Sequence, residues 1–177
     1  MENSANGGAV MLGVSSGTIV WTGGSVGIVG SFGPLEYWWQ PAGSSNWNPQ
    51  TVATGNFSDY AIAWTGSSMV IIATDVNGNL YYWWQEAGSD TWHAQTVASS
   101  NYGANLAWPS IAWTGSSVVI AAAVPSAGGP SPDTGLYYFW EDQLGANVWP
   151  MQTVSAWSSE NKGYAFPSIA WTGSSVV

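Results

Sequence analysis

One heptapeptide occurs three times in this chain of 177 residues, and it constrains the fold more than any other feature. Ile-Ala-Trp-Thr-Gly-Ser-Ser stands at 62–68, 111–117 and 169–175, and a looser copy stands at 19–25. The lead tryptophans of the four copies are 43, 49 and 58 residues apart. Repeats of roughly 40 to 50 residues are typical of propeller blades and of helical arrays, so the pattern inside the repeat must decide between the two.

Inside the repeat the pattern favours short strands. The second repeat predicts strands at 61–66, 68–75, 79–85 and 92–98, with an Asn77-Gly78 turn between the second and the third. Apolar side chains fall on both faces of these strands, so each sheet must be covered on both sides. Blades stacked around a ring meet that need. The predicted fold class is therefore all-β, a β-propeller built of four-stranded antiparallel blades.

The repeat also predicts how the chain is divided. A propeller typically has four to eight blades, and this chain holds three and part of a fourth. We expect the ring to close by homo-oligomerisation, with a dimer favoured, because a second copy would cover the exposed strand edges. The alternative is that the chain is a fragment of a longer single-chain propeller. The expected units are an N-terminal segment at 1–16 with a stray strand at 9–15, blades at 17–60, 61–109 and 110–167, an insertion at 125–134 in the third blade, and a partial blade at 168–177.

Charge and composition exclude several classes of protein. The net charge is −9, and Lys162 is the one basic residue. Binding to a phosphate backbone depends on Lys and Arg, so nucleic acids and anionic membranes are poor partners. Without cysteine there are no disulfides and no thiolate metal sites. The longest apolar run, 118–124, is too short to insert in a membrane, and no signal peptide is visible, which leaves the localisation open.

Tryptophan and glutamine recur at the turns on one side of the expected ring. An indole face beside amide and hydroxyl groups suits a sugar, whose C–H patch can lie on the ring while its hydroxyls take polar partners. Because the surface is repeated, we expect several weak carbohydrate sites that act through avidity. Trp64 and Trp83 are expected only to pack between blades. The candidate binding residues are Trp39, Gln40, Trp47, Trp84, Gln85, Trp92, Trp140 and Trp149.

Catalytic and metal sites have less support in the sequence. His93 is the one histidine and has no equivalent in the other repeats, which indicates a surface residue of a turn. The acidic residues do not recur at matching positions, so no carboxylate pair for glycoside hydrolysis can be nominated. The segment 75–79 has the oxygen side chains of a calcium loop, but a hairpin turn accounts for it better. We expect no cofactor, no metal and no enzymatic activity.

The blade pattern also carries a family resemblance. The blade pattern consists of Ile-Ala-Trp-Thr-Gly-Ser-Ser-Val-Val-Ile, followed by Asn-Gly-Asn-Leu-Tyr-Tyr-Trp-Trp-Gln, Gly-Ser, Trp and Gln-Thr-Val-Ala. This pattern resembles the bacterial β-propeller lectins of the Photorhabdus lectin type. The resemblance covers the chain from about Gly17 onward. It implies multivalent binding of fucose or O-methylated glycans in pockets between blades, with no enzymatic activity and no required metal.

Two departures qualify this resemblance. Members of that family look seven-bladed within one chain, and this chain is shorter. In the third repeat Phe139 stands in place of Trp83 and Glu141 in place of Gln85, which implies an altered or lost pocket there. The predicted function is a multivalent, sugar-binding lectin for neutral glycans. The alternative is a structural or protein-interaction propeller, and a glycosidase is disfavoured.

Overall fold

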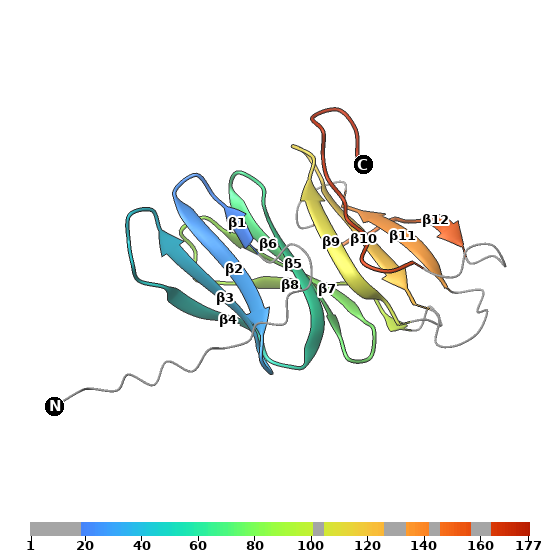
Figure 1. Ribbon diagram of the computed structural model, residues 1–177, viewed down its shortest axis with the longest axis horizontal. Helices are drawn as coiled ribbons and strands as arrows, with labels where there is room; N and C mark the ends of the chain where they lie inside the picture. Colours follow the sequence, from blue (N-terminus) through green and yellow to red (C-terminus); the bar gives the residue numbers. More distant parts are fainter. Residues whose placement is uncertain (1–18, 101–104, 126–133, 142–145, 157–163) are drawn as a thin grey trace.

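The computed structural model describes residues 19–100, 105–125, 134–141, 146–156 and 164–177. Within these residues the chain forms twelve strands in three four-stranded antiparallel sheets, each built from four consecutive strands (Figure 1). We call these sheets blades 1, 2 and 3. No helix in this part of the chain has the length and apolarity needed to span a membrane.

The strands follow one another around each blade without crossovers. Blade 1 consists of β1 (Ile19–Trp21), β2 (Ser25–Ser31), β3 (Leu35–Pro41) and β4 (Asn48–Ala53). Blade 2 consists of β5 (Phe57–Trp64), β6 (Ser68–Asp75), β7 (Leu80–Glu86) and β8 (His93–Ala98). Blade 3 consists of β9 (Ala107–Trp113), β10 (Val118–Val124), β11 (Gly135–Trp140) and β12 (Met151–Ala156).

The predicted all-β architecture of four-stranded antiparallel blades is confirmed. The largest difference from the predicted strands of blade 2 is the start of β5, which begins at Phe57 and not at residue 61, because Phe57 pairs with Asp75 beyond a bulge. The stray strand expected at 9–15 lies outside the described residues, as does most of the insertion expected at 125–134.

The repeated Trp-Thr-Gly-Ser-Ser motif is a hairpin turn. In blade 2 the backbone N–H of Thr65 donates to the carbonyl of Ser68 at 3.0 Å, and the Ser68 N–H donates to Oγ1 of Thr65 at 2.9 Å. Gly66 has φ of +97°, a conformation that glycine adopts at little cost. The same contacts join Thr22 to Ser25, Thr114 to Ser117 and Thr172 to Ser175. The most repeated part of the sequence therefore has a structural explanation.

Successive blades pack face to face and bury the core between them. Val29 and Leu35 of blade 1 pack with Ile71 and Trp83 of blade 2. The second interface joins Tyr82 of blade 2 to the buried apolar residues of blade 3. The first strands β1, β5 and β9 contact one another in order, as expected for blades arranged around a ring.

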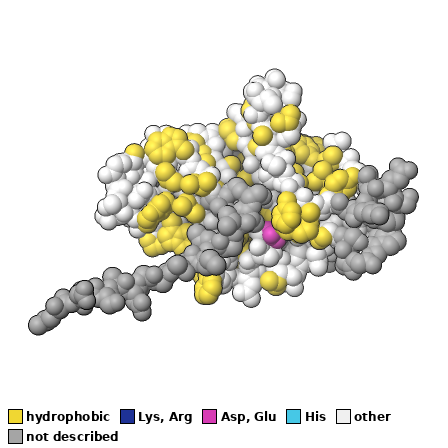
Figure 2. Space-filling view, in the orientation of Figure 1, with side chains coloured by type: hydrophobic (Ala, Val, Ile, Leu, Met, Phe, Trp, Pro, Cys, Tyr) yellow, Lys and Arg dark blue, Asp and Glu magenta, His cyan; other side chains and the backbone are white. Residues whose placement is uncertain are grey.

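The outer face of blade 1 is open. Ile19 is 64% exposed, whereas Ile62, at the same position of the repeat, is 6% exposed because blade 1 covers it. Trp21 and Trp47 are also exposed, and hydrophobic side chains reach the surface over blade 1 (Figure 2). At the other end of the chain, Ile169 of the partial repeat is buried against blade 3. Blade 1 thus presents the kind of face that is covered in the two internal interfaces.

Candidate functional site

A cavity of about 270 Å³ lies between blades 1 and 2, at the side of the sheets that carries the Thr-Gly-Ser-Ser turns. Both blades contribute to it. Its lining residues are Thr22, Ser25, Tyr37, Trp39 and Gln50 from blade 1, and Trp64, Met69, Gln85 and the β7–β8 turn at 86–90 from blade 2.

Two aromatic rings on β3 form one wall of the cavity. Tyr37 and Trp39 are two residues apart, so they point to the same face of the sheet. Their rings are stacked, with centroids 5.8 Å apart and an interplanar angle of 12°. Tyr37 is buried, which raises its pKa to about 12, and it meets the edge of Trp92 at 5.7 Å. Trp39 is half-buried, so part of its indole remains accessible.

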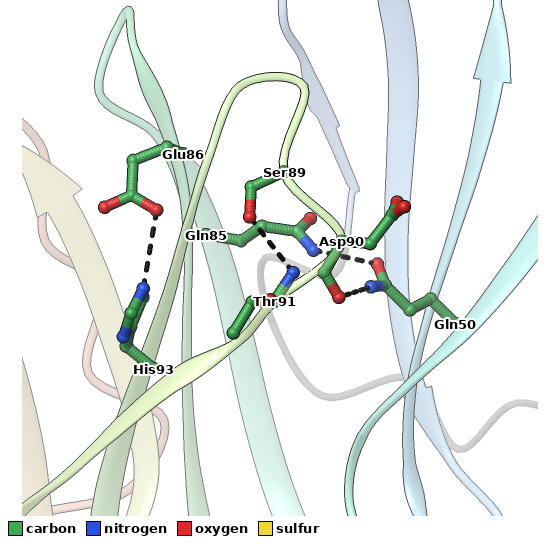
Figure 3. A network of polar contacts seen from close by, with 7 residues as sticks. All are labelled: Gln50, Gln85, Glu86, Ser89, Asp90, Thr91 and His93. Carbon is green, nitrogen blue, oxygen red and sulfur yellow. Dashed lines mark hydrogen bonds and ion pairs between the residues drawn. The ribbon is translucent and has the colours of Figure 1, made fainter.

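Two glutamines join the blades across the cavity (Figure 3). Gln85 Nε2 donates to Oε1 of Gln50 at 3.1 Å, and Gln50 Nε2 donates to the carbonyl of Asp90 at 2.8 Å. The turn is also tied locally, since the N–H of Thr91 donates to Oγ of Ser89 at 3.1 Å. Gln50 thereby holds the β7–β8 turn of blade 2 against β4 of blade 1.

His93 and Glu86 meet on the face of blade 2 that turns away from this cavity. His93 Nε2 and Glu86 Oε2 are 3.6 Å apart, and both side chains are exposed. An exposed pair of this kind contributes at most about 1 kcal/mol. The His93 ring also stacks on Trp84, with centroids 4.9 Å apart. Among the described residues there is no group of three or more His, Cys, Asp or Glu side chains that could hold a metal ion.

The structure separates residues that are neighbours in the sequence. Trp84 and Gln85 are adjacent on β7, so they point to opposite faces of blade 2. Gln85 faces blade 1 and lies in the cavity with Trp39, whereas Trp84 packs against the interface with blade 3. Trp92 packs at the interface with blade 1, together with Tyr37. The first interface therefore combines Trp39 of blade 1 with Gln85 and Trp92 of blade 2.

The remaining candidates occupy other positions of the ring. Trp149 lies at the interface of blades 2 and 3, where its ring meets Tyr82 at 5.0 Å. Trp140 stacks on Tyr138 and packs against Ile169 of the partial repeat. Trp47 is 42% exposed, and Gln40 follows Trp39 on the opposite face of the strand, so both belong to the open side of blade 1.

Gln50, on the fourth strand of blade 1, is a site residue that is not among the candidates from the sequence. Gln50 connects the two walls of the first cavity, and Gln95 takes the same position at the second interface. The signal was present in the Gln-Thr-Val triplet, which recurs at 50–52, 95–97 and 152–154. Trp64 and Trp83 were both expected only to pack, but Trp64 lines the cavity, and Trp83, although buried, lines a second cavity described below.

The interface of blades 2 and 3 differs in charge. Glu141 is fully buried at the position that Gln85 has in blade 2. Burial of Tyr82, together with the negative charge of Glu141, raises the pKa of the Tyr82 hydroxyl far above its usual range. The third repeat therefore brings a carboxylate to a place where the first interface has an amide.

Neither a protein-family model nor a curated protein matches the sequence. Solved structures that are similar to the chain include the following two. AofleA from Arthrobotrys oligospora, in a mutant with three arginines changed to alanine, has a TM-score of 0.53 and 12% identity over 89% of this chain and 46% of that chain. The catalytic domain of the Coprinopsis cinerea GH62 alpha-L-arabinofuranosidase has a TM-score of 0.51 and 14% identity over 85% of this chain and 52% of that chain.

These likenesses establish a β-propeller-type fold. The chain spans about half the length of each structure that it matches. Neither comparison points to the Photorhabdus type in particular. They also correct one expectation: the chain was predicted to have no enzymatic activity, but the same fold forms the catalytic domain of an arabinofuranosidase. The fold consequently gives no ground for excluding catalysis.

Proposed function

We propose that this chain binds neutral carbohydrates in the cavity between blades 1 and 2. The observation that carries this proposal is the accessible indole of Trp39 beside the Gln50–Gln85 amide pair in one cavity of about 270 Å³. A pyranose can place its C–H face on the indole while its hydroxyls exchange hydrogen bonds with amide groups. Those contacts need no metal and no charged partner.

The charges around the cavity support a neutral ligand. Glu86 and Asp90 line it, and no Lys or Arg is among its lining residues. Sugar hydroxyls can donate to the carboxylate of Asp90, whereas an anionic sugar would be repelled and would lack the Arg fork that recognises carboxylates in pairs of hydrogen bonds.

Fucose and O-methylated sugars are the glycans that we infer first. The resemblance to propeller lectins implies them, and the cavity contains apolar groups that suit a methyl substituent. Met69 and Ala87 line it beside Trp39. The methyl group of a deoxy or O-methylated sugar would be desolvated against these side chains, which is favourable by about 0.8 kcal/mol for each buried carbon.

The protein is proposed to be multivalent. The second interface repeats Trp84, Gln95 and Trp149 at the positions of Trp39, Gln50 and Trp92. Glu141 changes the chemistry of that interface, so its affinity should differ from that of the first. Linked weak sites that face one way strengthen binding by roughly 10² to 10⁴.

A second copy of the chain is proposed to cover the open face of blade 1, with a dimer favoured. Ile19, Trp21 and Trp47 are exposed there, although the matching Ile62 is buried inside the chain. Light scattering should give a multiple of the chain mass of 18.6 kDa. If the wild type has the mass of a single chain, and a Trp47→Ser variant has the same mass, this part of the proposal is refuted.

Glycan binding is the experiment that tests the main proposal. A glycan array, followed by calorimetry with free L-fucose and its O-methylated derivatives, should show binding that Trp39→Ala and Gln85→Ala weaken at least tenfold. Gln40→Ala is the matched control, because Gln40 has the same position in blade 1 but lies away from the cavity. An array without signal above background would overturn the proposal and favour a structural or protein-interaction propeller.

Glycoside hydrolysis is a second candidate, favoured by one observation. Asp90 lines the cavity, and Glu86 stands at its edge with its carboxylate toward His93; carboxylates beside a bound sugar are the usual apparatus of a glycosidase. Release of phenol from aryl glycosides, including arabinofuranosides, would support it if Glu86→Gln and Asp90→Asn each abolish the release. If the same sugars bind but no phenol is released, hydrolysis is refuted and carbohydrate binding remains as the proposed function.

A further inference from the structure

A second cavity, of about 420 Å³, lies at the other end of the interface between blades 1 and 2. Its walls come from the β4–β5 connection at 53–57, the β6–β7 turn at 75–77, and Tyr81, Trp83 and Ala94. It shares no lining residue with the first cavity. A ligand of this second cavity would therefore contact none of the residues that line the proposed sugar site.

Three aromatic rings line this second cavity. Phe57 stands nearly perpendicular to Tyr81, at 88° with centroids 6.3 Å apart, and nearly perpendicular to Trp83, at 88° and 5.4 Å. Tyr81 and Trp83 are 5.7 Å apart. Rings at right angles bound a corner in which one group can lie within about 6 Å of more than one ring centre, the range in which a cation is attracted to an aromatic face.

The acidic residue of this cavity is Asp75, and its oxygens are already engaged. Oδ1 accepts from the backbone N–H groups of Asn77 and Asn79, both at 2.9 Å. Oδ2 accepts from Nδ2 of Asn79 at 2.7 Å and from the hydroxyl of Tyr81 at 3.4 Å. An ionised carboxylate offers about four lone-pair sites, so these four donors use its hydrogen-bonding capacity.

Asp75 nevertheless keeps its negative charge. Burial alone would raise its pKa, but the hydrogen bonds from Asn79 and Asn77 outweigh that effect and lower the pKa below its usual value. No Lys or Arg is among the residues that line the cavity. The site therefore combines a full negative charge with a carboxylate that has no acceptor position left for a new N–H donor.

We propose that this second cavity binds a quaternary ammonium group, such as that of choline. A quaternary nitrogen has no N–H, so it gains the attraction of the Asp75 charge and of the aromatic faces without needing a hydrogen-bond acceptor. A primary ammonium carries three N–H donors that require acceptors, and Asp75 cannot supply them. The engaged carboxylate thus selects an alkylated cation over a primary amine.

Titration with choline chloride, followed by calorimetry and by NMR of backbone amides, tests this proposal. We expect saturable binding with shifts confined to 54–57, 75–77, 81 and 83, and about tenfold weaker binding of methylammonium chloride. Asp75→Asn removes the charge, keeps an oxygen that accepts from the turn, and should weaken choline binding about tenfold. Asp90→Asn is the matched control, because it makes the same charge change beside the first cavity.

Phe57→Leu is a second variant, which removes one aromatic wall without altering the turn, and it too should weaken choline binding. Phosphatidylcholine vesicles distinguish the source of the group: cosedimentation that free choline displaces would indicate a lipid headgroup, and choline binding without cosedimentation would indicate a small soluble ligand. The proposal is overturned by absence of choline binding, by equal binding of methylammonium, or by equal effects of Asp75→Asn and Asp90→Asn in folded variants.

Discussion

The indole Nε1 of Trp149 donates a hydrogen bond of 2.9 Å to Oε1 of Gln95 across the interface of blades 2 and 3. At the first interface the equivalent indole, that of Trp92, is buried with no hydrogen-bond partner among the described residues. There Oε1 of Gln50 accepts from Gln85 instead, at 3.1 Å. Blade 3 has Glu141 in place of Gln85, and a carboxylate has no N–H to donate. The replacement of Gln85 by Glu141 therefore accompanies a change in the group that donates to the fourth-strand glutamine, from an amide at the first interface to an indole at the second.

Replacing Gln95 by alanine should destabilise the protein. The change leaves the half-buried indole N–H of Trp149 without its partner, which costs about 1 kcal/mol. Gln152→Ala is the control, because Gln152 has the same position in the repeat but is exposed, and it should change stability by less than about 0.5 kcal/mol. Urea unfolding measures both values, and equal values for the two variants would contradict the role assigned to Gln95.

Replacing Gln85 by methionine should release Oε1 of Gln50 and allow the indole of Trp92 to donate to it, as Trp149 donates to Gln95. The indole N–H resonance of Trp92 should then move downfield and exchange more slowly with solvent. Gln40→Met should leave that resonance where it is. If the Trp92 resonance does not move in the Gln85→Met variant, the indole of Trp92 does not donate to Gln50 in the way that Trp149 donates to Gln95.

Two adjacent glycines in the β1–β2 turn should respond differently to alanine. Gly23 has φ of +90°, so Gly23→Ala should cost about 1 to 2 kcal/mol. Gly24 lies outside the left-handed region, and a Cβ there would have no atom within 4 Å. Gly24→Ala should therefore be neutral or slightly stabilising in thermal unfolding. A loss of stability confined to Gly24→Ala would contradict the geometry of the turn.

Stability should fall in alkali through Tyr37. Burial raises the pKa of Tyr37 from 10.0 to about 12, so the folded chain disfavours the ionised phenol more than the unfolded chain does. This contribution is complete below pH 10 and is lost as the pH rises toward 12. Urea unfolding between these limits should show a shallower loss for Tyr37→Phe than for the wild type. Identical slopes would show that Tyr37 does not titrate with a raised pKa.

The periodic parts of the fold could be predicted because the repeat is local. A turn such as Thr65–Ser68 and a hairpin such as Asn77-Gly78 are determined by residues a few positions apart, so the strands around them follow from the sequence. The start of β5 could not be predicted, because its first pairing, Phe57 with Asp75, spans a bulge that no periodic pattern reports.

Which residues line the candidate cavity could be determined only from the tertiary structure. Adjacent residues of a strand point to opposite faces, so Trp84 and Gln85 belong to different interfaces although they are neighbours in the chain. Trp39 and Gln85 meet only because blade 1 packs on blade 2. By itself the sequence determined the four-stranded blade, its turns, and the residue types that recur in it, namely tryptophan and glutamine. Which of those side chains share a cavity was decided by packing between blades, since that contact joins residues about one repeat apart.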